Sequence, residues 1–304
     1  MKKSLVFWGE KYLFSPGPLE WLISILLLPL SLLYCLIVWV RYKMSVPKDF
    51  GLPIVSVGNL IVGGSGKTPL TVALAKPYKK PAIVLRGYAR ESKGLFTVSD
   101  AKEILCDVKC SGDEAMLYST LLPHAIVIVA EDRVEGIRQA KSMGAEVIFL
   151  DDGYSKHFIK KLDLLIVSKQ ENPFCLPSGP FRERLWSSKE SVLIEEDKEF
   201  VRKVSISNPK ERMALVTAIS KPQRLDLYLD ERVIKKVYFP DHHAFTRDEL
   251  VSVLDETGAY SLLMTRKDAV KVTGFDLSLS FLELELEVDK KVHQTVQDYV
   301  RISS

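Results

Sequence analysis

The stretch VGNLIVGGSGKTPL, residues 57–70, limits the possible folds of this chain more than any other stretch does. It begins in a β-branched run, passes through a glycine-rich segment and ends where a helical pattern starts. A strand, a glycine loop and a helix in this order form the setting in which backbone N–H groups surround a phosphate. The pattern G-x-x-x-x-G-K-[ST] requires a glycine at the position of Ile61, so the outer end of the loop departs from the rule.

The loop supplies a set of candidate nucleotide ligands. Lys67 is expected to reach the β- and γ-phosphates, and Thr68 is expected to ligate Mg²⁺. A glycine-rich turn that binds nothing is the alternative, and Gly-Lys-Thr between a strand and a helix weighs against it. The candidate nucleotide-binding residues are Ile61, Val62, Gly63, Gly64, Ser65, Gly66, Lys67 and Thr68.

The stretch EVIFLDDG, residues 146–153, has the form of a buried strand that ends in acids. An aspartate in that place supports Mg²⁺ in nucleotide-binding enzymes, which makes Asp151 and Asp152 candidate metal ligands. Consecutive residues of a strand point to opposite faces, and a turn at Gly153 could bring both acids to one site. The alternative is a solvated turn or a helix cap.

Short hydrophobic runs alternate with helical patterns through most of the chain, which predicts a mostly parallel sheet with helices on both faces. The texture changes near Lys198, and further strands follow, including the alternating run LSFLELELEV, which is typical of an antiparallel or edge strand. We therefore predict an α/β, P-loop NTPase-like fold in three parts. These are an N-terminal membrane-associated helix and linker at 1–50, a nucleotide-binding domain at 51–210 and a smaller α/β domain at 211–304.

The N-terminal region holds a nearly unbroken apolar run from Trp21 to Val40. About 20 apolar residues are the length needed to cross a bilayer as a helix, with Pro29 expected to kink it. A secretory signal is a poor alternative because the run is too long and no cleavage site follows, and a buried core helix is seldom apolar all round. We predict membrane attachment, with spanning and lying in one leaflet both left open.

Composition limits the remaining classes. The chain has 304 residues and a net charge of +3, too mild a charge to indicate nucleic-acid binding. Its four cysteines include Cys106 and Cys110, which lack the second pair or histidine that a zinc site needs. The cysteines are interpreted as buried or idle thiols in a reducing compartment.

Two further stretches carry candidate catalytic groups. Asp113, in SGDEA, begins a predicted helix and is a candidate acid near an acceptor hydroxyl, or simply an acid at the positive end of the helix dipole. The stretch FPDHHAFT places Asp241, His242 and His243 together, where a histidine could tune a base or only pack in a loop.

Taken together, these stretches resemble one family, the tetraacyldisaccharide 4'-kinases, which are the lipid A 4'-kinases of Gram-negative bacteria. The matching stretches occur in family order over nearly the whole chain: LLLPLSLLY, PIVSVGNLIVGGSGKTP, RGYARESKG, SGDEAMLYSTLLPHAIVIVAEDR, VIFLDDGY, LPSGPFRERL, FPDHHAFT and MTRKDAVK. The family's loop also lacks the first glycine, so Ile61 is a family trait.

The resemblance implies an enzyme that transfers the γ-phosphate of ATP to the 4'-hydroxyl of a membrane-borne tetraacyldisaccharide 1-phosphate and forms lipid IVA. ATP and Mg²⁺ are the implied cofactors, and the cytoplasmic face of the bacterial inner membrane is the implied location. Two α/β domains with the nucleotide at the cleft between them are the implied architecture. No nucleic acid and no protein partner are implied.

The family's functional residues carry over position by position. Asp113 matches the proposed base and His242 matches its partner, while the loop residues, including Lys67, match their counterparts. Asp151 and Asp152 match the acid pair after the strand, and Glu183 in FRERL matches an acid near the metal.

The chain departs from the family in two places. The family usually continues DDGFQH where this chain has DDGYSKH, so the roles of that glutamine and histidine are not carried over to Ser155 and His157. The second domain opens with AISKPQRL, in which Ala218 and Ser220 leave close backbone approach in question.

Two other function classes compete with the kinase. A membrane-tethered nucleotide switch would need a guanine-reading N-K-x-D or T-K-x-D motif, and the nearest stretch, TRKD at 265–268, has its lysine out of register. A membrane structural protein with a relic loop would predict that Lys67→Ala changes no activity.

Overall fold

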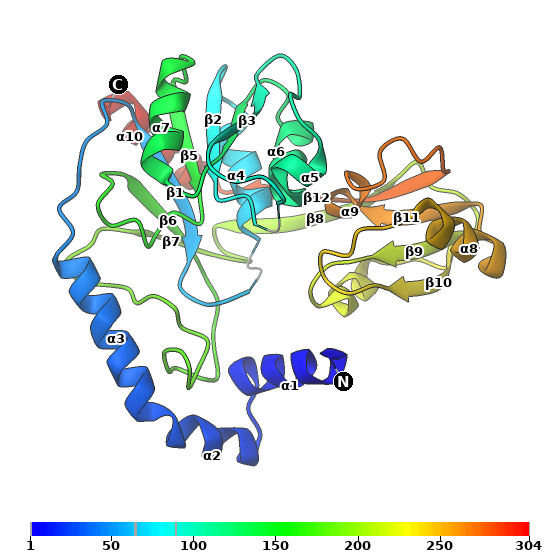
Figure 1. Cartoon of the computed structure of the whole chain (residues 1–304), viewed down its shortest axis with the longest axis horizontal. Helices are drawn as coiled ribbons and strands as arrows, with labels where there is room; N and C mark the ends of the chain where they lie inside the picture. Colours follow the sequence, from blue (N-terminus) through cyan, green and yellow to red (C-terminus); the bar gives the residue numbers. More distant parts are fainter. Residues whose placement is uncertain (1, 64–65, 89, 304) are drawn as a thin grey trace. The chain divides into compact units, whose positions relative to one another are not determined.

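The computed structural model describes residues 2–63, 66–88 and 90–303. The chain forms two compact units, each built from separate segments (Figure 1). The first unit contains Met1–Thr71, Val147–Phe200 and Val288–Ser304, and the second contains Val72–Glu146 and Val201–Glu287.

Parallel strands form the centre of the first unit. Their order is β5-β1-β6-β7, and β1 pairs in parallel with both β5 and β6. All residues of β1 and β5 are buried, as expected for parallel strands covered on both faces. The bounds are β1 (Ile54–Asn59), β5 (Val147–Asp151), β6 (Leu162–Val167) and β7 (Val192–Glu195), and the unit also contains the C-terminal helix α10 (Lys290–Ser303).

The N-terminal apolar run is divided between two helices, α2 (Pro18–Leu26) and α3 (Leu28–Lys43), which follow α1 (Lys2–Phe14). Pro29 explains the division, because proline has no N–H to donate to the preceding turn and its ring obstructs that turn's carbonyl. In the described part of the chain, no single helix has the length and apolar character of a membrane span. The pair α2 and α3 meets both criteria when taken together, with a bend of 59°. The prediction of one N-terminal membrane helix is therefore not confirmed.

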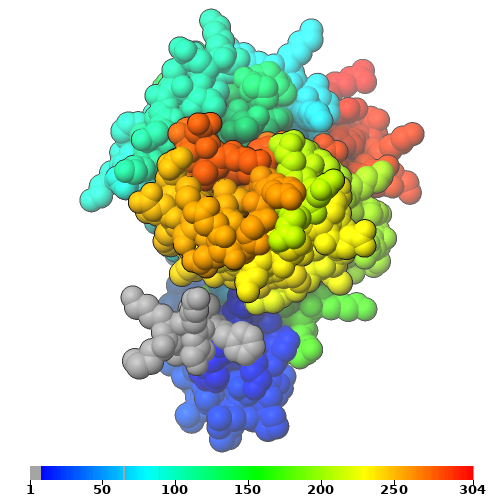
Figure 2. Space-filling view, turned by 90° about the vertical axis from the view of Figure 1, so that its right-hand side faces the viewer, coloured from blue at the N-terminus to red at the C-terminus, as the bar shows by residue number. Residues whose placement is uncertain are grey.

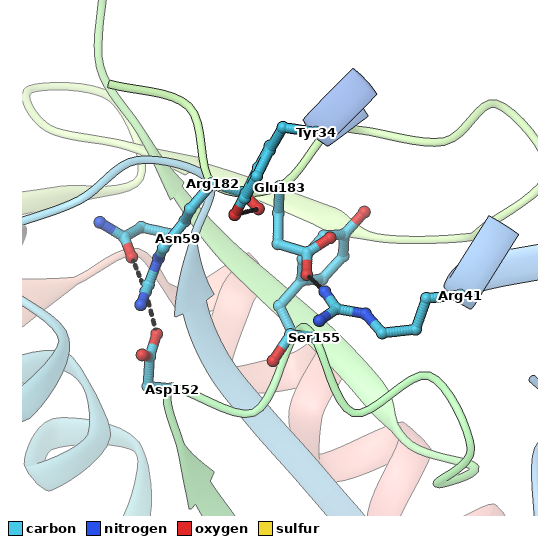
Figure 3. A pocket seen from close by; sticks show the side chains of 8 residues that line it. Tyr34, Arg41, Asn59, Asp152, Ser155, Arg182 and Glu183 are labelled. Atoms are coloured by element: carbon cyan, nitrogen blue, oxygen red, sulfur yellow. Dashed lines mark hydrogen bonds and ion pairs between the residues drawn. The ribbon is translucent and has the colours of Figure 1, made fainter. Parts of the chain in front are cut away.

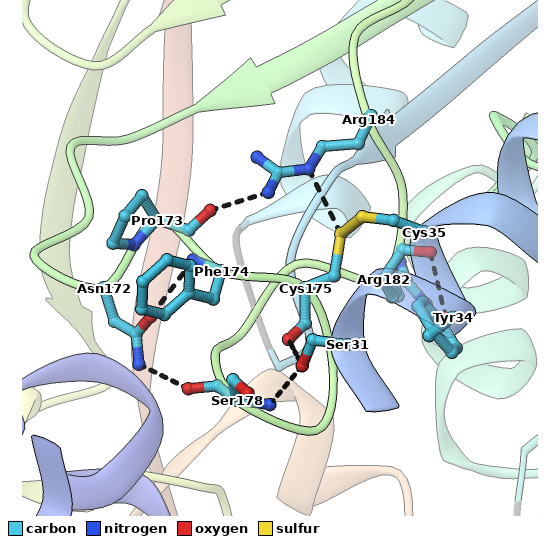
Figure 4. The surroundings of a disulfide bond; sticks show 10 residues. All are labelled: Ser31, Tyr34, Cys35, Asn172, Pro173, Phe174, Cys175, Ser178, Arg182 and Arg184. Atoms are coloured by element: carbon cyan, nitrogen blue, oxygen red, sulfur yellow. Dashed lines mark hydrogen bonds between the residues drawn. A yellow bond between two sulfur atoms is a disulfide. The ribbon is translucent and has the colours of Figure 1, made fainter. Parts of the chain in front are cut away.

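One side of this helix pair is polar and packs on the loop at 172–184 (Figure 4). Ser24 Oγ donates to the carbonyl of Ser178 at 2.5 Å, and Ser31 Oγ donates to the carbonyl of Cys175 at 2.9 Å. The opposite side is exposed and almost wholly apolar, with Leu26 77 % exposed. Its exposed large hydrophobic residues are Leu19, Leu22, Ile25, Leu26, Leu30, Leu32, Leu33, Leu36, Ile37, Trp39, Val40 and Met44.

A disulfide joins Cys35 of α3 to Cys175 of the same loop (Figure 4). The interpretation of the cysteines as buried or idle thiols is wrong for this pair, whereas Cys106 and Cys110 are free and only partly buried. The pairing escaped the sequence analysis because the two residues are 140 positions apart and nothing local marks them as partners.

The second unit contains a group of three strands in the order β3-β4-β2. β2 and β4 are parallel and β3 is antiparallel to β4, with α7 packed on β2 and β4 and α6 on β3 and β4. The bounds are β2 (Pro81–Leu85), β3 (Phe96–Asp100), α5 (Val108–Ser111), α6 (Asp113–Leu121), β4 (Ile126–Val129) and α7 (Arg133–Ser142). Helix α4 (Lys67–Ala75) begins in the first unit and ends in the second.

The second unit also holds a five-stranded sheet in the order β10-β9-β11-β12-β8. Successive residues of β9 face two hydrophobic clusters, with Ala214 and Val216 in one and Met213 and Leu215 in the other. Figure 2 shows one face of the segment that carries this sheet, coloured from yellow to orange. The bounds are β8 (Phe200–Ser207), β9 (Met213–Thr217), the 3-10 helix η1 (Pro222–Tyr228), β10 (Val233–Tyr238), α8 (Arg247–Thr257), β11 (Ser261–Thr265), α9 (Arg266–Ala269) and β12 (Leu279–Val288).

The prediction of mixed α/β structure with mostly parallel strands and a second sheet is confirmed. One local prediction is wrong. The run LSFLELELEV forms β12, which lies between β11 and β8 and pairs in parallel with β11, so it is not an edge strand. The polar stretch after Lys198 holds β8, whose alternating burial suits a strand with one wet face.

Candidate active site

The site in the first unit lies at the carboxyl ends of parallel strands. Asn59 is the last residue of β1, and Asp151 is the last residue of β5 and lies beside Val57 of β1. Asp152 follows in the left-handed conformation, with φ of 55°, and donates its backbone N–H to the Val57 carbonyl at 2.9 Å. Gly153 comes next because a Cβ there would lie 2.7 Å from the Leu150 side chain.

The glycine loop turns where its described glycines adopt positive φ, at Gly63 (93°) and Gly66 (87°). These values favour glycine because a Cβ would be strained there. Two of the predicted ligands, Gly64 and Ser65, lie outside the described residues. The outer end of the loop is extended, since Ile61 forms an antiparallel bridge with Phe181 and Val62 N–H donates to the Pro180 carbonyl at 2.9 Å. A glycine is therefore not required at position 61.

Lys67 begins α4 and points at the polar strand ends. Its Nζ lies 3.3 Å from Asn59 Oδ1 and 3.8 Å from Asp152 Oδ1. Arg182 joins the same two side chains, donating from Nη2 to Asn59 Oδ1 at 2.7 Å and pairing with the Asp152 carboxylate (Figure 3). Thr68 is the next residue of α4. Two cations therefore converge on one amide and one carboxylate.

A cavity of about 150 Å³ within the first unit is bordered by Asn59, Asp152 and Arg182 (Figure 3). The buried Nδ2 of Asn59 has no hydrogen-bond partner among the described residues, which is unusual for a buried amide and favours a site that a ligand completes. The lining residues are Tyr34, Arg41, Asn59, Asp152, Tyr154, Ser155, Arg182 and Glu183.

Glu183 is buried on the far side of this cavity and is held by Arg41 of α3 (Figure 3). Its Oε2 faces His157 Nε2 at 3.5 Å. Lys189 Nζ lies 3.1 Å from His157 Nδ1, and because an ammonium only donates, the ring proton of neutral His157 is on Nε2, toward Glu183. Burial lowers the pKa of His157, against the opposing effect of Glu183.

The predicted magnesium ligands are all oxygen donors, as this ion prefers. Mg²⁺ at phosphoryl-transfer sites typically takes one or two carboxylates together with phosphate oxygens and water. Asp152 and Glu183 line one cavity, and Asp151 ends the strand beside β1, which leads to the loop with Thr68. In the described ranges, no three His, Cys, Asp or Glu side chains are arranged to hold a metal ion by themselves. The donor set therefore fits a magnesium ion whose coordination a nucleotide completes.

The second unit holds a separate cluster around Asp113. The preceding Gly112 has φ of 81°, and a Cβ there would lie 2.9 Å from the Tyr88 carbonyl oxygen, so glycine is required just before Asp113. Asp113 Oδ2 lies 3.0 Å from His242 Nδ1 and 3.2 Å from Lys271 Nζ. The predicted base and its predicted partner, 129 residues apart, therefore lie in contact.

The backbone of His242 is unusual, with φ of 60° in a residue that has a side chain. Its N–H donates to the Ala218 carbonyl at 3.0 Å, which holds this conformation. Strained backbone of this kind is often found at functional sites. Burial raises the pKa of Asp113, but the hydrogen bond from His242 and the ammonium of Lys271 outweigh burial, so this pKa lies below its ordinary value.

Sequence reasoning missed three residues of these clusters. Asn59 carried a weak signal, because it is a polar residue at the end of an otherwise hydrophobic strand. Arg182 and Lys271 lie within the stretches FRERL and MTRKDAVK, which support the family resemblance without marking either residue. Their contacts depend on folding of distant segments, which no local spacing reveals.

Comparison with known proteins agrees with this chemistry. The family model described as Tetraacyldisaccharide-1-P 4'-kinase matches residues 23–205 and 187–301. A protein of Aliarcobacter butzleri named tetraacyldisaccharide 4'-kinase is 45 % identical over 302 residues, 96 % of each chain. Proteins of the same name from Helicobacter pylori and Campylobacter jejuni are 44 % and 39 % identical, covering 96 % and 99 % of this chain and 94 % and 98 % of their own.

A solved structure is also similar. It is a crystal structure of LpxK from Aquifex aeolicus, described as an apo form in complex with ATP. The TM-score is 0.76 at 26 % identity, and the match covers 91 % of this chain and 99 % of the other. The strand-end loop, the paired acids and the matches over nearly the full length lead to one conclusion: this chain belongs to the tetraacyldisaccharide 4'-kinase family.

Proposed function

We propose that this chain transfers the γ-phosphate of ATP to the 4'-hydroxyl of tetraacyldisaccharide 1-phosphate and so forms lipid IVA in lipid A biosynthesis. The observation that carries the proposal is the 45 % identity to a relative named for this activity, extending over 96 % of both chains. The ATP bound in the similar Aquifex aeolicus structure supports ATP as the donor.

Nucleotide binding is assigned to the first unit. Lys67 lies at the start of α4 and is suited to the β- and γ-phosphates, while the loop N–H groups surround them. Arg182 and Lys67 already share Asp152 as a partner, so both cations are near the place where phosphate charge would replace that carboxylate. Thr68, Asp151 and Asp152 would hold Mg²⁺, with Glu183 beside them. When bound, Mg²⁺ neutralises charge on the phosphate oxygens.

The acceptor side of the reaction is assigned to Asp113. Its carboxylate accepts the proton of the 4'-hydroxyl while the new O–P bond forms. The bond between the γ-phosphorus and the bridging oxygen breaks, and ADP leaves with that electron pair. His242, which donates from Nδ1 to Asp113 Oδ2, keeps the carboxylate in place.

Membrane association is assigned to the pair α2 and α3. A span across the bilayer requires apolar surface all round, whereas one side of this pair is bonded to the loop at 172–184 through Ser24, Ser31 and the Cys35–Cys175 disulfide. Crossing would carry that polar loop through the hydrocarbon. The exposed apolar side instead suits insertion into one leaflet, as interfacial helices insert. Because ATP is the donor and the lipid is membrane-borne, the cytoplasmic face of the bacterial inner membrane is the proposed location.

Phosphate transfer is tested with γ-labelled ATP, Mg²⁺ and the disaccharide lipid in mixed micelles. The wild-type protein is expected to place label in the lipid, and Lys67→Met, checked for folding by thermal unfolding, is expected to lose transfer. Folded wild-type protein that binds ATP but leaves the lipid unlabelled would rule the proposal out.

Leaflet insertion is tested by flotation with lipid vesicles. Exchanging exposed Leu33 for glutamate is expected to weaken vesicle binding about tenfold or more, because burial of a leucine side chain contributes about 1.5–3 kcal/mol. Leu227→Glu, at an exposed leucine outside the helix pair, is the matched control. Equal vesicle binding by the wild type and Leu33→Glu would contradict the assignment.

A further inference from the structure

Lys271 is a buried lysine beside the Asp113 carboxylate. It lies two residues beyond the end of α9, its side chain is 5 % exposed, and its Nζ is 3.2 Å from Asp113 Oδ2. Lysine is rarely buried unless it is paired, because removing its charge from water is costly. Its second carboxylate partner is Asp268, at 3.4 Å, and the ring of Phe245 lies 5.5 Å from Nζ.

Asp268 does not depend on Lys271 for its hydrogen bonds. This fully buried carboxylate accepts from three other groups: Thr217 Oγ1 at 2.6 Å, Thr265 Oγ1 at 2.8 Å and the Ala218 N–H at 3.2 Å. Asp113, in contrast, has only Lys271 and His242 as side-chain donors in the described structure. Asp268 thus holds the ammonium in place. Asp113 is the carboxylate whose pKa the ammonium lowers.

Both donors act on the same oxygen of Asp113. His242 Nδ1 and Lys271 Nζ both face Oδ2, and Oδ1 has no hydrogen-bond partner within the described ranges. Two donors on one oxygen restrict rotation of the carboxylate and leave the other oxygen for a substrate hydroxyl. We propose that Lys271 is a positioning residue for phosphate transfer, which fixes Oδ2 of Asp113 and keeps Oδ1 ionised and directed at the acceptor hydroxyl.

This inference rests on the proposed role of Asp113 as the base, and it predicts a specific dependence on pH. A base must be ionised to accept a proton, so activity falls as pH drops through the pKa of Asp113. The ammonium lowers that pKa, and its removal therefore moves the acid limb of the profile upward.

The arrangement of the other charged groups around Asp113 allows the effect of Lys271 to be tested separately from theirs. Asp241 lies 3.8 Å from His242 Nε2, and Lys267 lies 4.0 Å from Asp241. Lys267 therefore shares the neighbourhood without contacting Asp113, which makes it a matched control. Asp268 is a further charged group in this neighbourhood, and it contacts Lys271 directly.

The test is the pH profile of kcat/KM for lipid phosphorylation by the full chain in wild-type, Lys271→Met, Lys271→Arg and Lys267→Met forms. Lys271→Met is expected to move the acid limb up by about one unit or more, within the range produced by a neighbouring opposite charge. Lys271→Arg keeps the charge and is expected to stay closer to the wild type. Lys267→Met is expected to leave the limb in place.

A profile of Lys271→Met that falls equally at all pH values, or that keeps the wild-type limb, would overturn the inference, because a purely structural role scales activity without moving the limb. Lys271→Gln, which keeps an N–H donor but no charge, decides the matter by the same criterion if Lys271→Met fails to fold. Asp113→Asn distinguishes failure of this inference from failure of the proposed kinase activity. If that variant still transfers phosphate, the base assignment and this inference both fail while the kinase activity stands.

Discussion

Asp152 in the first unit and Asp113 in the second are both paired with two basic side chains, yet the two carboxylates differ in exposure and in what their partners are. The Asp152 side chain is 37 % exposed, lines a cavity, and is paired with Arg182 and Lys67. The Asp113 side chain is 16 % exposed and is paired with His242 and the buried Lys271.

The difference separates two uses of an ion pair. Arg182 and Lys67 are cations of the kind that bind phosphate, so a nucleotide can take the place of Asp152 as their partner. The Ala218 carbonyl holds the backbone of His242 and Asp268 holds the Lys271 ammonium, so both partners are expected to stay on Asp113 during the reaction. The cations beside Asp152 can therefore exchange that carboxylate for a phosphate. The basic groups beside Asp113 are expected to keep their carboxylate partner.

The largest effect is expected from a substitution that disrupts only the cluster around Asp113. Asp113→Asn keeps the size of the side chain and removes the base, so turnover is expected to fall by about 10²- to 10⁴-fold. ATP binding is assigned to the cluster around Asp152, so the ATP affinity of Asp113→Asn is expected to equal that of the wild type in equilibrium binding. Equal losses of affinity and turnover would show that the two clusters are not distinct in function.

The next largest effect is expected from a substitution that disrupts only the cluster around Asp152. Arg182→Met removes a charge-assisted partner of the phosphates, worth about 1.5–3 kcal/mol, so ATP affinity is expected to fall by roughly tenfold to a hundredfold. Arg184→Met is the matched control, because Arg184 contacts Cys175 and the Pro173 carbonyl outside the cavity. An Arg182→Met protein that binds ATP like the wild type would show that the pair with Asp152 is only structural.

A smaller effect on ATP affinity is expected from the disulfide, which belongs to the first unit and anchors the loop that carries Arg182. Cys35→Ser is expected to lower the free energy of unfolding by at most about 2–4 kcal/mol and to weaken ATP affinity a few-fold. The acid limb set by Asp113 is expected to be unchanged. Cys110→Ser, at a free cysteine, serves as the control, and equal destabilisation by both changes would contradict this account.

The smallest expected effect is on stability in acid. The pKa of Asp113 is lowered in the folded state, so its ionisation stabilises the fold above the ordinary aspartate pKa. That contribution is lost as pH falls through the lowered value, where the folded carboxylate takes up its proton. Chemical denaturation at a series of pH values should therefore show a weaker acid dependence for Asp113→Asn, and an identical dependence would refute the linkage.

The sequence predicted those parts of the molecule whose signals are local. The strands around the glycine loop and before Asp151 are short hydrophobic runs with clear ends, and they formed as expected. Pro29 indicated a kink, but the sequence could not say that the run would divide into two helices bent by 59°.

Residues brought together by distant segments were beyond local reasoning. The contact between Asp113 and His242 came from the family resemblance alone, and the disulfide came from neither source. Lys271 is one of many lysines in the sequence, and only the fold distinguishes it by burying it against two carboxylates. Similarly, Ile61 broke a sequence rule, and its bridge with Phe181 shows why the extended backbone there needs no glycine.

The central claim is that a phosphate passes from ATP to one hydroxyl of the disaccharide. The most direct test is to locate the new phosphate on the product by phosphorus–proton correlation in nuclear magnetic resonance, using wild-type protein, ATP, Mg²⁺ and the tetraacyl lipid. A single new phosphate ester on O4' is expected. Phosphate on another hydroxyl, or released only as inorganic phosphate, would contradict it.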